Sequence, residues 1–357
     1  MRVIDLTDSH SGLEAFVVID HELFPLAVGG TRMLPDIEVH EVARLARAMT
    51  WKFAACHVPY AGAKAGLRFS RGNRDEVLEL YKNALEPHRE VWVTGPDMGT
   101  APADFLRGDE DPLPLWARTH DGLGMDDLAT GHGVKAAADA ALAHVGRTLE
   151  GAAVAVEGFG KVGAGTARAC VRADARLVGV STADGMLADP KGLDVDELIA
   201  LRERHGDGFV EHGPRRPRPR EELFQLDCDV LVPGARPDAI TAMVAERLRC
   251  RVVAPAANIP YGAGAVEILH RREIVAVPDF LANAGGVHLY DTVAQDTEPV
   301  AALAVIEKAV GESVAGTLRA SRDLGITPLA AAFLDARDYL AEATGAPVEL
   351  VTELIPT

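Results

Sequence analysis

The sequence predicts an α/β fold in two domains, the second of them a doubly wound parallel sheet. The chain has 357 residues, and single domains usually have about 100–200, so its length suits two domains. Between about residues 151 and 278, short apolar runs alternate with helical patterns. This alternation is typical of a parallel sheet covered by helices on both faces. The first of these apolar runs leads directly into a glycine-rich turn.

The composition and charge exclude several kinds of partner. Hydrophobic residues make up 48% and charged residues 25% of the chain, which is ordinary for a globular protein. The formal net charge of −17 argues against nucleic acid or a membrane as the main partner, because both attract basic surfaces. The four cysteines and the histidines lack metal-site spacings, so no metal is expected. The charged N-terminus lacks the apolar core of a secretion signal, and a cytoplasmic location is expected.

The first half of the chain contains one strong helix pattern, over residues 38–55. Its apolar residues recur at helical spacing and form one stripe, made of Val42, Leu45, Ala46, Met49 and Phe53. Arg44 and Arg47 are expected on the opposite side of this helix. Strand-like apolar runs at residues 14–21 and 91–95 accompany it, so this half is predicted to be α/β as well.

The second half contains the apolar runs of the parallel sheet, at residues 152–158, 176–181, 229–234, 251–256 and 273–278. The segment 211–220, rich in arginine and proline, could bind an anion, but a solvated loop is the commoner interpretation. After Val300 the sequence is helical. Thr327 followed by Pro328 is a typical start of a helix, with the threonine as N-cap and the proline in the first turn.

The glycine-rich turn has the spacing Gly-x-Gly-x-x-Gly, at Gly158, Gly160 and Gly163. After a strand and before a helix, this spacing is typical of a Rossmann dinucleotide-binding domain. The first glycine allows the tight turn, the second lets the backbone approach a pyrophosphate, and the third lets the helix pack on the strand. A glycine-rich turn without a ligand is the alternative. The expected cofactor-binding residues of this turn are Gly158, Phe159, Gly160, Lys161, Val162 and Gly163.

The end of the second strand lacks the acidic residue that usually binds the ribose hydroxyls of NAD. Ser181 and Thr182 occupy that place, and Asp184 is the nearest carboxylate. A missing carboxylate also removes the repulsion of a 2′-phosphate. We therefore expect Ser181 and Thr182 to lie at the cofactor, and the missing carboxylate keeps NADP open as an alternative to NAD.

Two lysines of the first half are candidates for acid–base chemistry. The chain has 29 arginines but only 7 lysines, and lysine, unlike arginine, can lose its proton when it is desolvated. Lys52 lies at the edge of the apolar helix stripe, and small residues flank Lys64. The alternatives are that Lys52 extends its ammonium to solvent and that Lys64 is a loop lysine. Asp97 lies in a Gly/Pro-rich turn, where a plain turn aspartate is the commoner interpretation.

Eight motifs together resemble one known family. They are GGTRMLPDIEVHEVARLARAMTWK, YAGAKAGL, TGPDMGT, ATGHGV, VAVEGFGKVG, DCDVLVPGA, AANIP and PDFLANAGGV, which span residues 26–289. Their order and approximate spacing are similar to those of the glutamate/leucine/phenylalanine/valine dehydrogenases. This resemblance implies reversible oxidative deamination of an L-amino acid to its 2-keto acid and ammonium, with a nicotinamide cofactor.

The resemblance also implies roles for individual residues. Lys64 would be the catalytic lysine and Asp97 its acidic partner, while Lys52 would bind the α-carboxylate of the substrate. Thr130 and Asn258 would contact the cofactor. Asn283 would help to fix both the nicotinamide and the substrate in a cleft between the domains.

The resemblance predicts the domain organisation. Residues 1–129 would form the α/β domain for substrate binding and oligomerisation, and residues 130–318 the Rossmann dinucleotide-binding domain. The C-terminal helices in residues 319–357 would pack back on the first domain. A homo-oligomer, at least a dimer, is expected.

The substrate end departs from the glutamate enzymes of the family. These carry a lysine just before the Gly-Gly pair, where this chain has Leu26-Ala27-Val28, so a second carboxylate would be buried without a partner. The pocket would be lined by Val28, Gly29, Met49, Val287 and Tyr290. We therefore expect an apolar or modestly polar amino acid, as in the leucine/phenylalanine/valine branch. The segment 105–121 has no assigned role.

Two alternatives share this scaffold. One is a biosynthetic enzyme that reductively aminates an atypical keto acid. The other is a homologue that binds the cofactor without catalysis and serves regulation. The joint presence of Lys52, Lys64 and Asp97 argues against the second alternative.

Overall fold

The computed structural model describes residues 1–106 and 113–354. Part of the 105–121 segment thus falls outside the described residues. The chain forms two compact units: unit 1 comprises residues 1–113 and 333–357, and unit 2 comprises residues 114–332. Among the described residues, no helix is both long and apolar enough to cross a membrane.

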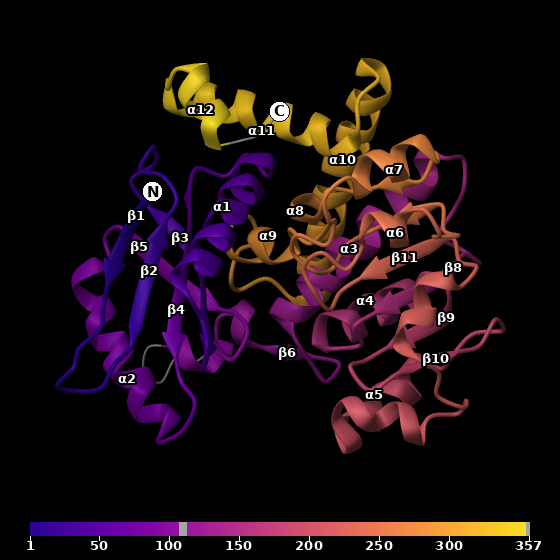
Figure 1. The fold of residues 1–357 in the computed structure, drawn as a ribbon, viewed down its shortest axis with the longest axis horizontal. Coiled ribbons are helices and arrows are strands. Elements are labelled where there is room, and N and C mark those ends of the chain that lie inside the picture. The colour runs from indigo at the N-terminus through magenta and orange to yellow at the C-terminus, as the bar shows by residue number, and fades with distance from the viewer. Residues whose placement is uncertain (107–112, 355–357) are drawn as a thin grey trace. The chain divides into compact units, whose positions relative to one another are not determined.

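Unit 1 is built on a five-stranded mixed sheet with the order β1-β2-β4-β3-β5 (Figure 1). The strands are β1 (Arg2–Asp5), β2 (Ala15–Ile19), β3 (Ala27–Leu34), β4 (Ala61–Arg68) and β5 (Trp92–Pro96). Strand β3 runs parallel to both β4 and β5, whereas β2 is antiparallel to β4 and β1 is antiparallel to β2. The predicted runs at 14–21 and 91–95 correspond to β2 and β5. The Gly/Ala-rich strands β3 and β4 were not expected from the sequence.

Two helices cover the two faces of this sheet. Alternate residues of β4, such as Ala63 and Ala65, are buried in the same cluster as Tyr81 of α2 (Arg74–Leu85). The other face, with Val18 of β2, packs against Val42 of α1 (Val39–Ala55). Because strand side chains alternate between faces, Lys64, which pairs with Val18, lies on the α1 face.

Helix α1 confirms the helix predicted over residues 38–55, with one correction. Arg47 does not simply face solvent, because its guanidinium forms an ion pair with the buried Asp20, at 2.7 Å. Arg47 also donates to the carbonyl of Glu353, and the indole of Trp51 donates to the carbonyl of Leu354. These bonds tie α12 (Val348–Leu354) to α1 within unit 1. The preceding helix, α11 (Pro328–Thr344), begins at the predicted place, where the Thr327 hydroxyl accepts from the Ala330 amide.

Unit 2 contains a six-stranded sheet with the order β10-β9-β8-β11-β12-β13. Its strands are β8 (Ala153–Glu157), β9 (Arg176–Ser181), β10 (Met186–Ala188), β11 (Val230–Pro233), β12 (Val252–Val253) and β13 (Val275–Ala276). All pairs are parallel except β10 with β9. The five apolar runs predicted as strands match β8, β9, β11, β12 and β13. This strand order is that of a doubly wound sheet, whose switch point lies between β8 and β11. A short ribbon of β6 (Thr119–His120) and β7 (Leu123–Gly124) precedes it.

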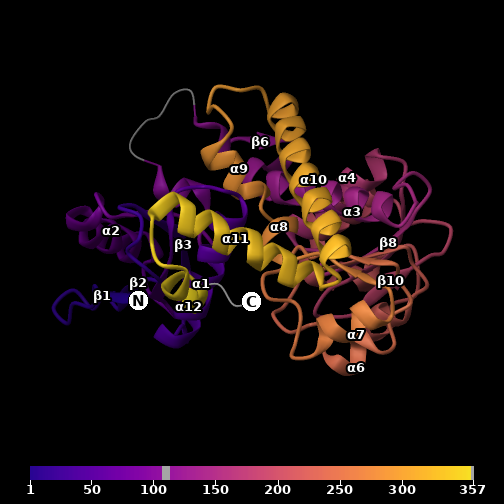
Figure 2. The same ribbon diagram turned by 90° about the horizontal axis from the view of Figure 1, so that it is seen from above.

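The helices of unit 2 include two long ones that pack side by side, α3 (Met125–His144) and α10 (Pro299–Leu324) (Figure 2). The others are α4 (Lys161–Arg172), α5 (Val195–His205), α6 (Ala242–Ala245), α7 (Ala265–Arg271), α8 (Asp279–Ala282) and α9 (Gly285–Asp291). The expected domain boundaries at 129/130 and 318/319 fall inside α3 and α10. Since both helices pack as wholes within unit 2, its limits in the structure are wider, at residues 114 and 332.

Candidate active site and cofactor site

Two cationic side chains of unit 1 meet at the carboxylate of Asp97. The ammonium of Lys64 on β4 lies 3.0 Å from Asp97 Oδ2, and Nε of Arg32 on β3 lies 3.1 Å from the same oxygen. Arg32 also pairs with Glu41 of α1, at 2.9 Å. The Lys64 side chain is only 7% exposed. The interpretation of Lys64 as a solvated loop lysine is therefore wrong: it is a buried strand residue in an ion-pair cluster.

The two cations determine the protonation of Asp97. Burial alone would raise the pKa of this carboxyl, but the charges of Lys64 and Arg32 outweigh burial and hold the pKa well below its usual range. Asp97 is therefore ionised at neutral pH. It stands as a fixed negative charge beside the Lys64 ammonium.

Two glycines leave space for the Lys64–Asp97–Arg32 cluster, and a threonine fixes the turn that carries Asp97. A Cβ on Gly30 would lie 2.6 Å from the Pro96 carbonyl oxygen and 3.3 Å from the Lys64 ammonium. On Gly29 it would lie 1.8 Å from the carbonyl oxygen of Ala63, so β3 approaches β4 closely at this point only because Gly29 has no side chain. The Thr100 hydroxyl accepts from the Asp97 amide and donates to the carbonyl of Thr31, which fixes the turn after β5.

The other expected substrate residues of unit 1 lie on α1 and β3. Lys52 is 9% exposed, so its ammonium does not extend freely into solvent. Met49 and Val28 are half-buried. Strand alternation places Val28 on the same face of the sheet as Gly30 and Lys64, beneath α1.

In unit 2, the turn after β8 has the three glycine environments expected of a dinucleotide-binding turn. Gly158 has a φ of +85°, and a Cβ there would lie 2.8 Å from the Ala235 amide nitrogen. A Cβ on Gly163, in the first turn of α4, would lie 2.1 Å from the Gly158 carbonyl oxygen. Among the described residues, nothing lies within 4 Å of a Cβ placed on Gly160. The turn is therefore tightly packed at its two ends and open at the position where a pyrophosphate would approach.

Two other expected cofactor residues are held by the protein itself. The Phe159 side chain is buried against Phe209, with ring centroids 5.5 Å apart, so only its backbone faces the turn. The carbonyl of Ser181 accepts from the Gly158 and Phe159 amides. The Thr182 hydroxyl donates to the carbonyl of Asp207. The Ser181 backbone thus holds the turn, and Thr182 is tied to the segment at Asp207. Lys161 and Val162 begin α4 and are more exposed.

Asn283, Asn258 and Thr130 lie in the same unit. The amide nitrogen of Asn283 donates to the side-chain oxygen of Asn258, at 3.1 Å, and to the Ala257 carbonyl. Its Oδ1 atom is buried and has no hydrogen-bond partner among the described residues, which is costly unless a ligand supplies a donor. The amide of a nicotinamide is such a donor, so these residues fit the cofactor. The Thr130 hydroxyl donates to the carbonyl of Asp126 within α3.

The two remaining pocket residues, Val287 and Tyr290, lie on α9 in unit 2. Val287 is 9% exposed, while Tyr290 is partly exposed and packs against Trp116, with ring centroids 5.7 Å apart. Trp116 belongs to the segment that the sequence left without a role. Its ring forms an aromatic surface together with Tyr290.

Family models and related proteins of known name match this chain over most of its length. The family model for Glu/Leu/Phe/Val dehydrogenase, dimerisation domain, matches residues 2–106, and the model for Glutamate/Leucine/Phenylalanine/Valine dehydrogenase matches residues 122–299. The chain is 37% identical to a glutamate dehydrogenase of Thermotoga maritima, over 73% of this chain and 67% of that protein. The chain belongs to the glutamate/leucine/phenylalanine/valine dehydrogenase family.

Two further similarities extend this finding. The chain is 33% identical to an NAD-specific glutamate dehydrogenase of Staphylococcus aureus, over 72% of this chain and 66% of that protein. A solved structure of the hetero-hexameric glutamate dehydrogenase from Thermus thermophilus, in its Leu-bound form, superposes with a TM-score of 0.81 at 26% identity. It covers 96% of this chain and 88% of that one. The chain spans about two thirds of the length of the two relatives compared by sequence.

Arg32 contacts Asp97 directly, but the sequence analysis gave it no role. The signal was present in the GGTR sequence, because Arg32 alternates with Gly30 and so lies on the Lys64 face of β3. The ATGHGV motif has a packing role as well. A Cβ on Gly131 would lie 2.7 Å from the Thr166 amide nitrogen of α4, so this glycine lets α3 and α4 approach closely.

Proposed function

We propose that this chain is an NAD(P)-dependent amino-acid dehydrogenase that reversibly converts an L-amino acid and water into a 2-keto acid and ammonium. The observation that carries the proposal is the buried Lys64–Asp97 pair, 3.0 Å apart, in a chain of this family. This buried ion pair does not fit the alternative interpretations, in which Asp97 is a plain turn aspartate and Lys64 a loop lysine. Burying two charges is costly unless they serve each other or a reaction.

The roles of the residues in this reaction follow from their charge and surroundings. Lys52 would bind the α-carboxylate of the substrate by a charge-assisted hydrogen bond. A nicotinamide held here would supply the acceptor for the hydride of the substrate Cα, and loss of that hydride would leave an imine on the substrate. Lys64 and Asp97 would activate a water molecule for attack on the imine carbon and move protons as ammonia leaves. Arg32 would keep Asp97 ionised and oriented through this cycle.

The cofactor is proposed to be NAD, with NADP as the alternative. The Gly158–Gly163 turn would cradle the pyrophosphate with backbone amides at the start of α4. Thr130, Asn258 and Asn283 would surround the nicotinamide. Ser181 and Thr182 provide no carboxylate to repel a 2′-phosphate, so selection against NADP is expected to be weak.

The substrate is proposed to be an apolar or modestly polar amino acid. The residues proposed to line its side chain, as the family resemblance implies, are Val28, Gly29, Met49, Val287 and Tyr290. The relatives compared above are named glutamate dehydrogenases, but Leu26-Ala27-Val28 supplies no cation for a second carboxylate. A buried carboxylate without a partner costs several kcal/mol. Biosynthetic reductive amination would use the same residues in the reverse direction.

A homo-oligomer, at least a dimer, is part of this proposal. The family model that matches residues 2–106 is described as a dimerisation domain. Size-exclusion chromatography with light scattering would measure the mass in solution, and a monomer at micromolar concentration would contradict it.

One assay tests the activity and the substrate class together. The protein is mixed with ammonium, NADH or NADPH, and each of a panel of 2-keto acids, and the loss of nicotinamide absorbance is followed. Apolar and aromatic keto acids should be turned over, several of them with similar efficiency, because an apolar pocket discriminates by only about 1–3 kcal/mol per methylene. Best activity with 2-oxoglutarate would contradict the proposed substrate class. No turnover with any keto acid would favour the non-catalytic alternative.

A further inference from the structure

Four charged side chains of unit 1 form a chain in which cations and carboxylates alternate. Lys64 and Arg32 both contact Asp97 Oδ2, at 3.0 and 3.1 Å, and Nη1 of Arg32 lies 2.9 Å from Glu41 Oε1. The side chain of Lys64 is 7% exposed and that of Glu41 is 42% exposed, so the chain leads from the interior to the surface. The proposed reaction uses Lys64, Asp97 and Arg32, whereas Glu41 has no role in it.

Arg32 divides its guanidinium group between two carboxylates. Its Nε donates to Asp97 and its Nη1 donates to Glu41. The two acceptors come from different elements, because Asp97 follows β5 and Glu41 lies in the first turn of α1. A guanidinium is planar, so bonds from two of its nitrogens fix the orientation of the whole group. With a single bond, the long side chain could turn about its contact with Asp97.

Helix α1 connects this contact to the proposed substrate site. Glu41 lies at the start of α1, and Lys52 lies near the end of the same helix. At about 3.6 residues per turn, the two side chains fall on the same face of the helix, about 16 Å apart along its axis. One helix thus carries both the proposed ligand of the substrate carboxylate and, through Arg32, a contact to Asp97.

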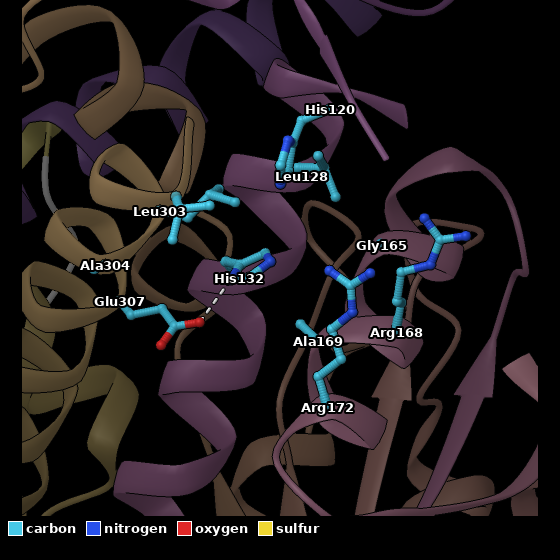
Figure 3. A pocket seen from close by; sticks show the side chains of 11 residues that line it. His120, Leu128, His132, Gly165, Arg168, Ala169, Arg172, Leu303, Ala304 and Glu307 are labelled. Carbon is cyan, nitrogen blue, oxygen red and sulfur yellow. Dashed lines mark hydrogen bonds and ion pairs between the residues drawn. The ribbon is translucent and has the colours of Figure 1, made fainter. Parts of the chain in front are cut away.

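A charged cluster in unit 2 is built differently. In the pocket between α3, α4 and α10, Glu307 lies 2.6 Å from Nδ1 of His132 (Figure 3) and 3.0 Å from the Lys135 ammonium. Both partners of Glu307 lie on α3, one turn apart, so the helix itself sets their spacing. The two cations at Asp97 come from separate strands, β3 and β4. The position of Arg32 therefore depends on contacts from outside its own strand.

We propose that Glu41 is a positioning residue for the acid–base pair. It holds Arg32 in the orientation in which Nε faces Asp97, and so keeps Asp97 in place beside Lys64. This role rests on the proposed dehydrogenase function, in which a displacement of about 1 Å can cost about 10²-fold in rate. An ion pair with a partly exposed member contributes little through its charge. The acceptor oxygen of Glu41, more than its charge, is therefore the feature that the site needs.

Steady-state kinetics of three variants test this role. Glu41→Ala removes the acceptor, so kcat should fall roughly tenfold, while KM for the amino acid should stay unchanged because Lys52 is still present. Glu41→Gln keeps an oxygen at the same reach and should retain most of the wild-type kcat. Glu38→Ala is the matched control, because Glu38 directly precedes α1, is 61% exposed and pairs with His40. A wild-type kcat in Glu41→Ala, or equal losses in Glu41→Ala and Glu41→Gln, would overturn the proposal.

Two further measurements separate positioning from a general effect on the fold. In an Arg32→Gln background, Glu41→Ala should cause no additional loss of kcat, because Glu41 acts through Arg32. Crystal structures of the wild type and of Glu41→Ala should differ at the Arg32 guanidinium, which should leave Asp97 Oδ2 in the variant. An additional loss in the double variant, or an unmoved Arg32 in the crystal structure, would overturn the positioning role even if kcat falls.

The same experiments separate this inference from the proposed function. A wild-type protein that turns over none of the keto acids would remove the dehydrogenase activity, and the role of Glu41 with it. Turnover by the wild type together with unchanged kinetics in Glu41→Ala would remove the role of Glu41 alone.

Discussion

Asp97 in unit 1 and Asp127 in unit 2 are carboxylates in environments that act on them in opposite ways. Both are removed from water, which disfavours their charge. Around Asp97, the cations Lys64 and Arg32 outweigh this effect and lower the pKa. Around Asp127, partial burial and the neighbouring charge of Asp126 raise the pKa to about 6. Burial therefore does not by itself determine whether a carboxylate is charged. The charges of the neighbouring side chains determine it.

The two surroundings also differ in how they would bind a ligand. Unit 1 offers a preformed cluster of charged side chains on a sheet whose glycines leave space for it. Unit 2 offers a turn of backbone amides and glycines, with Gly160 open to the outside. Acid–base chemistry in unit 1 is thus expected to depend on individual charged side chains. Cofactor binding in unit 2 is expected to depend on glycines, which leave the backbone amides accessible.

The largest effect is expected for Lys64→Ala, which removes the nearest cation of Asp97 and the proposed acid–base group. Turnover should fall by about 10²–10⁴-fold or more, the usual contribution of general acid–base catalysis. Dinucleotide binding, measured by quenching of intrinsic fluorescence, should stay nearly unchanged because Lys64 belongs to unit 1. Lys82→Ala, at a lysine on α2 of the same unit, is the control and should behave like the wild type. A Lys64→Ala enzyme with a tenth of wild-type activity would remove Lys64 from the mechanism.

A smaller effect on kcat and a larger one on KM are expected for Lys52→Ala. This lysine is proposed to bind the substrate carboxylate, and loss of a desolvated charge contact costs about 2–5 kcal/mol. KM for the amino acid should therefore rise at least tenfold, while KM for the cofactor should change little. Steady-state kinetics with both substrates varied measures the two constants. An unchanged KM for the amino acid would contradict the assignment.

The helix 38–55, the doubly wound sheet and the glycine turn were predictable from the sequence because each has a local signature. Helix α1 has an apolar stripe, and β8, β9 and β11 are short apolar runs. Strands β3 and β4 were missed, since Ala-Gly-Ala-Lys and Gly-Gly-Thr-Arg have low strand propensity. They are strands because sheet pairing and packing under α1 override that propensity. Lys64 was consequently a candidate by its chemistry and by the family resemblance, without a place in a sheet. That Lys64 and Arg32 both pair with Asp97 depends on the register of three strands.

Two glycines of unit 2 allow a matched test of the backbone-based site. Gly163→Ala would place a Cβ 2.1 Å from the Gly158 carbonyl oxygen, so it should destabilise unit 2 and lower the melting temperature. Gly160→Ala meets nothing within 4 Å among the described residues and should melt like the wild type. It should nevertheless weaken NAD binding by roughly tenfold, or about 1.4 kcal/mol, because the methyl group would stand where the pyrophosphate approaches. Equal melting temperatures, or wild-type NAD affinity in Gly160→Ala, would contradict this division of roles.

Asp127→Asn tests the second carboxylate of the comparison through stability and is not expected to change turnover. Burial and the charge of Asp126 raise the pKa of Asp127 from its usual value of 3.8 to about 6 in the folded protein, so the folded state holds its proton more tightly than the unfolded state. Wild-type stability is therefore lost as pH rises from about 4 to about 6. Because asparagine does not titrate, the variant should gain on the wild type over that range and keep the gain at higher pH. The gain should be of order 1–3 kcal/mol, since one pKa unit corresponds to about 1.4 kcal/mol.

Urea denaturation at pH 4.5 and pH 7.5 measures this gain in the free energy of unfolding. The control is Asp139→Asn, at an exposed position of the same helix. A variant that is less stable than the wild type at pH 7.5 would show that the Asp127 charge is stabilised by its surroundings, as that of Asp97 is, and the contrast between the two carboxylates would fail.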